Sequence, residues 1–185
     1  MESATRITPD YDAFPTAHGP VLITDTEDKE IISLDASTGS VNWKLTMSTG
    51  IGSEESIAAT PQTGVPTHQV VVSPNGRYLA IQTHSYLTPE DSENIGDQRV
   101  GITVLDTKTG ETVRSVEVPG LVLGQALTND SLAVEIAQNY YPAGTGVVTV
   151  FSLSDAQAEP TSFRSDQWLI GASPESLLMS QELPS

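Results

Sequence analysis

The residues that catalysis most often uses are sparse in this chain and poorly spaced for it. The three histidines have no metal-ligand spacing; they are His18, His68 and His84. A histidine at a strand end, such as His84, could titrate or ligate a metal, but a solvated or structural side chain is the favoured interpretation. The chain has no G-x-S-x-G, H-E-x-x-H or phosphate-binding glycine loop. We therefore expect no catalytic residue, no metal site and no cofactor.

An acidic stretch and a pair of tyrosines are better candidates, and the function they suggest is binding. Asp91 and Glu93 stand in a segment that faintly matches a calcium-binding loop, but Ile95 occupies the position of an oxygen ligand. A solvated acidic loop is therefore the favoured interpretation of this stretch. Tyr140 and Tyr141 could stack on a sugar or on a partner side chain, with tyrosines that cap a strand as the alternative. The candidate binding residues are His84, Tyr86, Asp91, Glu93, Tyr140 and Tyr141.

A repeated segment indicates which elements must position these side chains. Residues 31–46 read IISLDASTGSVNWKLT, and residues 102–117 read ITVLDTKTGETVRSVE. In each copy an Asp carboxylate can bond the amides of its own turn, and a Gly can adopt positive φ. Apolar or alternating residues lie on either side, so each copy predicts a strand, a turn and a strand. The turn residues of the two copies are Asp35 with Gly39 and Asp106 with Gly110.

Further turn signals extend this pattern along the chain. The dipeptide Asn75-Gly76 between two apolar runs strongly predicts a hairpin. A turn at residues 128–130 separates two more predicted strands. Residues 173–175 fit a hairpin in the register of the repeat, with the start of a helix as the alternative.

The spacing of these turns predicts the organisation of the domain. We expect an N-terminal arm at residues 1–20, with a weak strand signal near Tyr11 to Phe14, and a single domain at residues 21–185. In repeated four-stranded units the tight turns lie at one end, and the longer connections leave from the other end, which is the expected binding face. The long connections are residues 48–68, 85–99 and 139–146. The expected units are 21–47, 69–118 and 121–165, with the start of a further unit at 168–185.

Two segments resemble known repeat families. Residues 33–43 resemble the docking motif of quinoprotein (PQQ-like) β-propellers, whose usual sequence is close to ALDAxTGxxxW. In these families the Trp clamps neighbouring blades, so the resemblance implies this role for Trp43 and, in the second copy, for the stem of Arg114. Residues 70–81 resemble the inner hairpin of YVTN or lactonase-like propeller repeats. The resemblance implies an all-β, WD40-like β-propeller arc of four-stranded antiparallel blades, and it marks architecture rather than activity.

The number of predicted units is too small for a closed ring. Propellers close with about four to eight blades, and this chain predicts about three and a half. An unclosed arc exposes apolar blade faces and strand edges at both ends. We therefore expect an incomplete ring that is part of a larger propeller. The alternatives are self-association through the exposed edges, or a compact ring that uses the N-terminal arm as an extra strand.

Composition limits the partners. The 24 acidic and 8 basic residues give a net charge of −16, which repels phosphate backbones and anionic membranes, so we expect no nucleic-acid partner. The absence of cysteine excludes disulfides, thiolate metal sites and covalently attached c-type haem. No run approaches the roughly 20 apolar residues of a membrane helix, and the N-terminus has no apolar targeting region. We expect a soluble chain, and the trimmed extracytoplasmic part of an exported or anchored bacterial protein would have the same features.

These features favour a non-catalytic β-propeller scaffold or binding module. It would bind a protein partner or a small ligand through the face that carries the long connections. The alternative is a fragment of a quinoprotein-like or lactonase-like propeller enzyme. Such an enzyme needs a cationic, metal-binding centre, which the 8 basic residues supply only thinly.

Overall fold

The computed structural model describes residues 11–24, 29–47, 70–84, 99–137 and 145–181. These residues form antiparallel strands, and the described part of the chain contains no helix. No helix in that part is therefore long and apolar enough to cross a membrane.

The first four-stranded sheet runs in chain order β1-β2-β3-β4. Its strands are β1 (Tyr11–Phe14), β2 (Val21–Thr24), β3 (Lys29–Leu34) and β4 (Val41–Met47). Phe14 pairs with Val21 at the turn end of the β1-β2 ladder. The weak strand signal near Tyr11 to Phe14 thus corresponds to β1, the first strand of this sheet.

The second and third sheets repeat the same meander. The second has the order β5-β6-β7-β8, and the third has the order β9-β10-β11-β12. The second sheet consists of β5 (Val70–Val72), β6 (Tyr78–His84), β7 (Arg99–Asp106) and β8 (Thr112–Pro119). The third consists of β9 (Val122–Leu127), β10 (Ser131–Ile136), β11 (Val147–Ser152) and β12 (Thr161–Arg164).

The last sheet contains only two strands, β13 (Trp168–Ala172) and β14 (Leu177–Ser180). They pair antiparallel, and the amide of Ser173 donates to the carbonyl oxygen of Ser176 across the turn. The hairpin interpretation of residues 173–175 is thereby confirmed, and the helix alternative is wrong.

Glycines make the tight turns possible. Gly39, Gly76 and Gly110 have φ values of 68°, 69° and 75°. This left-handed region is strained for residues that carry a Cβ atom. Each glycine therefore reverses the chain between two strands at a position that the repeated turn motif or the Asn-Gly signal predicted.

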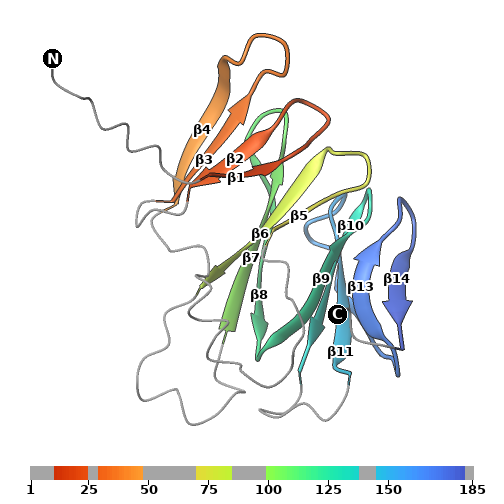
Figure 1. Ribbon diagram of the computed structural model, residues 1–185. Helices are drawn as coiled ribbons and strands as arrows, with labels where there is room; N and C mark the ends of the chain where they lie inside the picture. The colour runs from red at the N-terminus through yellow and green to blue at the C-terminus, as the bar shows by residue number, and fades with distance from the viewer. Residues whose placement is uncertain (1–10, 25–28, 48–69, 85–98, 138–144, 182–185) are drawn as a thin grey trace, which may run out of the picture.

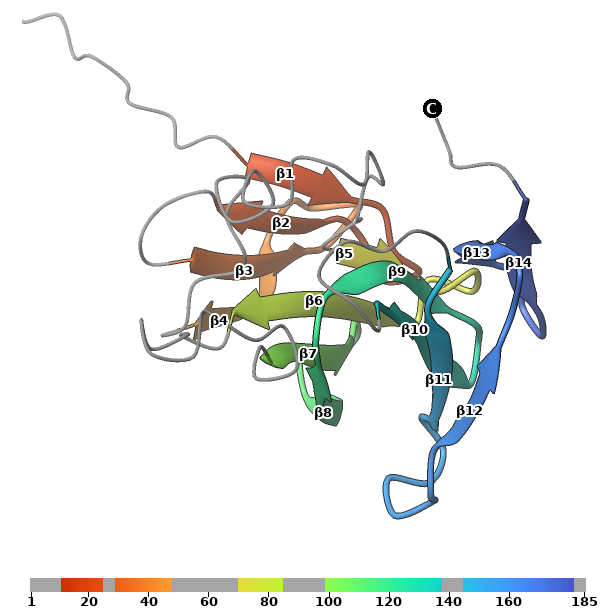
Figure 2. The same cartoon turned by 90° about the horizontal axis from the view of Figure 1, so that it is seen from below.

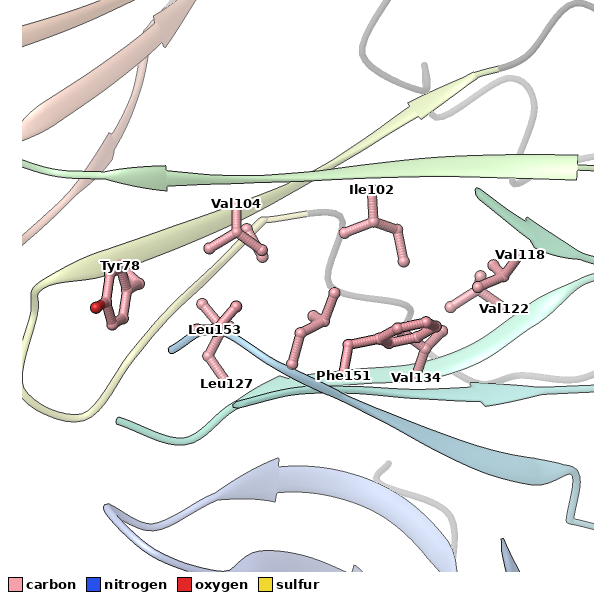
Figure 3. Packing of buried hydrophobic residues seen from close by; sticks show 11 residues of the cluster. Tyr78, Ile102, Val104, Val118, Val122, Leu127, Val134, Phe151 and Leu153 are labelled. Atoms are coloured by element: carbon pink, nitrogen blue, oxygen red, sulfur yellow. The ribbon is translucent and has the colours of Figure 1, made fainter. Parts of the chain in front are cut away.

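Apolar layers between neighbouring sheets form the core. The layer between the first and second sheets includes Ile31 and Leu79, and both are fully buried. Figure 3 shows the layer between the second and third sheets, where the side chains of Ile102 and Val104 face those of Phe151 and Leu153. A third, smaller layer joins β13 and β14 to the third sheet. Each sheet thus buries side chains against the sheet that follows it in the chain.

The sheets follow one another side by side along an arc (Figures 1 and 2). The sheet β1–β4 lies at one end of the arc, and the hairpin β13–β14 lies at the other. Radially repeated four-stranded meanders are the blades of a β-propeller. The predicted fold class is confirmed: the chain is an all-β, propeller-like arc of antiparallel blades, and its ring is not closed.

Candidate binding surfaces

The expected binding residues fall mostly outside the described residues. Tyr86, Asp91 and Glu93 lie within residues 85–98, and Tyr140 and Tyr141 lie within residues 138–144. His84 is the last residue of β6, and its side chain is also outside the described part. Binding through these residues therefore stays a prediction.

The opposite end of the strands, where the tight turns lie, is joined from blade to blade by hydrogen bonds. The amide of Ala17 donates to the carbonyl oxygen of Gly76 over 3.0 Å. The amide of Asn75 donates to the side-chain oxygen of Asn129 over 3.0 Å. The amide of Asn129 donates to the carbonyl oxygen of Pro174 over 2.9 Å. The turn between the first two strands of each blade thus donates a hydrogen bond to the corresponding turn of the next blade. These bonds fix the blades relative to one another.

The two aspartates of the repeated motif hold their own turns. The Asp35 carboxylate accepts hydrogen bonds from the amide and hydroxyl of Ser37 and of Thr38. The Ser37 hydroxyl, more than any other donor, lowers the pKa of Asp35 well below its usual range. The Asp106 carboxylate accepts from the amide of Lys108 and pairs with Arg77 over 3.4 Å. In both turns the carboxylate accepts hydrogen bonds from backbone amides of its own loop.

Trp43 joins the first blade to the second. Its indole Nε1 donates to the carbonyl oxygen of Thr107 over 3.0 Å. A Cβ atom added to Gly110 would lie only 2.8 Å from Cδ2 of Trp43, so the ring packs directly on this glycine. The outer strand β4 therefore docks on the β7-β8 turn of the next blade.

Arg114 makes the corresponding contact between the second and third blades. Its Nη1 atom donates to the carbonyl oxygens of Ser152 and Asp155 over 3.2 and 2.9 Å. Its guanidinium carbon lies 5.7 Å from the centre of the Phe151 ring, within the range of a cation–π interaction. Trp43 and Arg114 are each the third residue of an outer strand, and each reaches the turn between the last two strands of the next blade.

Glu135 and Gly124 hold the third blade against the hairpin β13–β14. The fully buried Glu135 carboxylate accepts from the amide of Gly146 over 2.7 Å and from the amide of Leu169 over 2.8 Å. An added Cβ at Gly124 would lie 2.4 Å from the Leu169 carbonyl oxygen. The inner strand β13 is thus fixed closely to β9, although its sheet has only two strands.

The exposed large hydrophobic side chains lie toward the two ends of the arc. Among the described residues, Tyr11 and Val41 are exposed in the first sheet. Phe163 is 43% exposed on β12, and Ile170 and Leu178 are 43% and 47% exposed on β13 and β14. Within the described ranges, no large hydrophobic side chain of the second sheet is exposed to this degree. Among the described residues, the second sheet has a neighbouring sheet on both sides, whereas the first sheet and the hairpin β13–β14 each have one on a single side.

Two buried amides form a polar feature between the second and third blades. Gln125 is 6% exposed, and neither atom of its amide group has a hydrogen-bond partner; the amide nitrogen of Gln82 is also buried without one. Gln82 pairs with Ile102 and Gln125 with Val134, so both lie on strand faces that line the same apolar layer.

The described residues include no group of three or more His, Cys, Asp or Glu that could hold a metal ion.

Sequence analysis did not identify Phe163, Ile170 or Leu178 as candidates. Phe163 had no distinct signal, because the strand pairing makes Thr161, and not Phe163, the counterpart of Arg114 in the third blade. The exposure of Ile170 and Leu178 had no signal in the sequence, since alternating apolar residues also occur in strands covered on both faces.

No protein-family model matches this chain, and no curated protein matches it. Several solved structures are similar in fold. Acylaminoacyl peptidase from Pyrococcus horikoshii has a TM-score of 0.62 at 14% identity, over 92% of this chain and 28% of that one. Acylaminoacyl peptidase in complex with Z-Gly-Gly-Phe-chloromethyl ketone has a TM-score of 0.60 at 16% identity, over 91% and 28%. The uncharacterized protein lmo1340 from Listeria monocytogenes has a TM-score of 0.53 at 11% identity, over 89% and 44%.

The chain spans less than half the length of each of these structures. At such low identity the likeness shows the fold alone, and the activities of these proteins do not transfer with it. The fold of the chain is therefore shared with parts of larger proteins, and its own function must be argued from its surfaces.

Proposed function

We propose that the chain is a non-catalytic β-propeller module that binds a protein partner through the open end of its arc. One observation carries this proposal: each of the last three described strands exposes a large hydrophobic side chain, namely Phe163, Ile170 and Leu178. Exposed apolar groups at a strand edge favour association with another chain. The fixed contacts between blades keep this end in a defined shape, which reduces the entropy lost on binding.

The long-loop face is a second proposed surface of the same module. It rests on the sequence alone, through Tyr140 and Tyr141, whose rings could stack on a ligand or partner. Replacing both tyrosines with Ala should impair binding there without unfolding the chain.

Site-specific photocross-linking tests the proposal. The photoreactive residue p-benzoylphenylalanine would replace Ile170 or Leu178 in the cells that produce the protein, with exposed Ser115 in the middle blade as the control position. Discrete protein adducts from the two positions at the open end, but not from Ser115, are the expected result. No adduct from the open end, or an equal yield from Ser115, would contradict the proposal. With the photoreactive residue also placed at Tyr140, an adduct from that position alone would reject the open end and favour the long-loop face.

A further inference from the structure

We propose that one water molecule is bound between the second and third blades, where it connects the side-chain amides of Gln82 and Gln125. The site belongs to the junction between these two blades, so it goes beyond the partner surface proposed above and does not depend on it. Both amides are uncharged, and the ligand must accept hydrogen bonds from their nitrogens and donate one to the Gln125 oxygen.

The first argument comes from buried polar groups. Gln125 on the inner strand β9 is 6% exposed, and within the described residues neither its amide oxygen nor its amide nitrogen has a hydrogen-bond partner. The amide nitrogen of Gln82 on β6 is also buried and without a partner in this part of the chain. Buried polar groups are almost always hydrogen-bonded, and internal water serves those that reach no protein group. Two nitrogens and one oxygen therefore need partners here.

The second argument is that both side chains enter the same layer. β9 contacts β5 and β6 of the preceding blade. Gln82 pairs with Ile102 and Gln125 pairs with Val134, and both of these partners belong to the apolar cluster between the two blades. Because residues directly opposite in a ladder share a face, the two amides approach this layer from opposite sides.

The next junction shows what a polar side chain does at the position of Gln82. Gln82 follows Leu79 by three residues, and Leu79 pairs with the last residue of β5. Glu135 follows Leu132 by three residues, and Leu132 pairs in the same way with the last residue of β9. Glu135 is therefore the counterpart of Gln82 in the third blade. Its carboxylate crosses to the next blade and accepts from the amide of Leu169 over 2.8 Å.

Gln125 has the place in β9 that Leu169 has in β13. Counted from the hairpin turn, Gln125 forms the third residue pair of its ladder with Val134. Leu169 forms the third pair of the β13-β14 ladder with Met179. Gln82 therefore reaches toward Gln125, as its counterpart in the third blade reaches Leu169.

The first junction has an apolar residue at this position. Gln82 pairs with Ile102, and Ile31 is the equivalent of Ile102 in the repeated segment. Ile31 pairs with Ile23, which is buried and packs in the apolar layer between the first and second blades. The buried amides are therefore specific to the second junction and are not a general feature of the repeated unit.

Water fits the groups that lack partners. The surrounding side chains form an apolar cluster that includes the fully buried Ile102 and Val134, so a charged ligand would find no counter-charge there. One water molecule can accept a hydrogen bond from each amide nitrogen and donate one to the Gln125 oxygen. Internal water typically makes about three hydrogen bonds of this kind.

Magnetic relaxation dispersion of the water oxygen nucleus tests the proposal on the full chain, because it reports water that stays bound. Gln125→Leu should lower the dispersion amplitude by the contribution of one water molecule, and Gln82→Leu should do the same. The double variant should lose no more than either single variant, since both remove the same molecule. Gln157→Leu is the matched control because Gln157 is exposed, and it should leave the amplitude unchanged. Circular dichroism checks that each variant keeps its strands.

An amplitude that is unchanged in Gln125→Leu would overturn the proposal. A loss in the double variant equal to two molecules would overturn the shared site, because each amide would then hold its own water.

Nuclear Overhauser effects between water and side-chain amide protons locate the molecule in the wild type, so this measurement does not depend on how any variant folds. At Gln82 and Gln125 we expect cross-peaks of opposite sign in the laboratory and rotating frames, which mark long-lived water. The exposed Gln157 should not show this pattern. The absence of such a cross-peak at Gln125, or a direct contact between the two amides without one, would contradict the water site.

Discussion

Trp43 and Thr107 are 64 residues apart in sequence, and a hydrogen bond of 3.0 Å joins the indole Nε1 of the first to the carbonyl oxygen of the second. The bond connects the outer strand of one blade to a turn of the next. Replacing Trp43 with Ala removes both this bond and the packing on Gly110. We expect a loss of about 3 kcal/mol in the free energy of unfolding, measured by urea titration.

Trp43→Phe is the matched control for this prediction, because it keeps one aromatic ring and loses the donor together with part of the ring area. It should cost about 1 kcal/mol. An Ala variant as stable as the wild type would show that the indole does not join the blades.

Gly110 and Gly39 have nearly the same φ but different surroundings. Alanine at either position is strained by positive φ, at a cost of about 1 to 2 kcal/mol. At Gly110 the added methyl group also meets the Trp43 ring, whereas at Gly39 no atom lies within 4 Å. Thermal unfolding should therefore show the lower Tm for Gly110→Ala. In a Trp43→Ala background this difference should disappear, and a difference that persisted would contradict the contact.

The turn around Asp35 predicts a specific pH dependence. Its pKa is lowered because the Ser37 hydroxyl, and then Thr38, donate hydrogen bonds to the ionised carboxylate. A lowered pKa in the folded state means that the stabilisation is present above the pKa of the unfolded chain and is lost as pH falls. Carboxyl carbon NMR should show Asp35 still ionised at about pH 3, below its ordinary range. Titration of this carboxyl near pH 4 would exclude the hydrogen-bonded turn in solution.

Glu135 is expected to control the attachment of the hairpin β13–β14. Glu135→Ala leaves the buried amides of Gly146 and Leu169 without an acceptor, and each such group costs about 1 to 3 kcal/mol. In a Trp43→Phe background, Trp168 of β13 is the only tryptophan. Its emission should shift to longer wavelength in the Ala variant and shift less in Glu135→Gln, which keeps one acceptor oxygen. Equal emission wavelengths for Glu135→Ala and Glu135→Gln would show that Glu135 does not control the attachment of the hairpin.

Much of the fold follows from local sequence signals. The repeated Asp and Gly of the turns, the Asn75-Gly76 dipeptide and the alternation in β4 depend on neighbouring residues, so the sequence predicts them directly. β1 was harder to predict because it has four residues, three of which are exposed, so its apolar pattern is weak.

The candidate surface was not predictable in the same way. Whether Phe163 is covered depends on a strand pair in the next blade, and this relationship does not appear in the alternation of β12 itself. The burial of Gln125 and Glu135 likewise results from packing between blades. Each is a polar residue in an otherwise apolar strand, and the neighbouring blade covers it. Phe163 pairs with the fully buried Val148, so only the packing around the third blade shows that its own side chain is exposed.

The most direct test of the central claim is a titration with Nile red, an uncharged dye that the net charge of −16 does not repel. The account predicts saturable fluorescence enhancement with the wild type at concentrations where sedimentation shows a monomer. Enhancement should fall severalfold when Phe163, Ile170 and Leu178 are all replaced with Ser, and it should be unchanged by Thr112→Ser with Glu117→Gln in the middle blade. No enhancement with the wild type, or equal enhancement with the triple variant, would contradict an apolar binding surface at the open end.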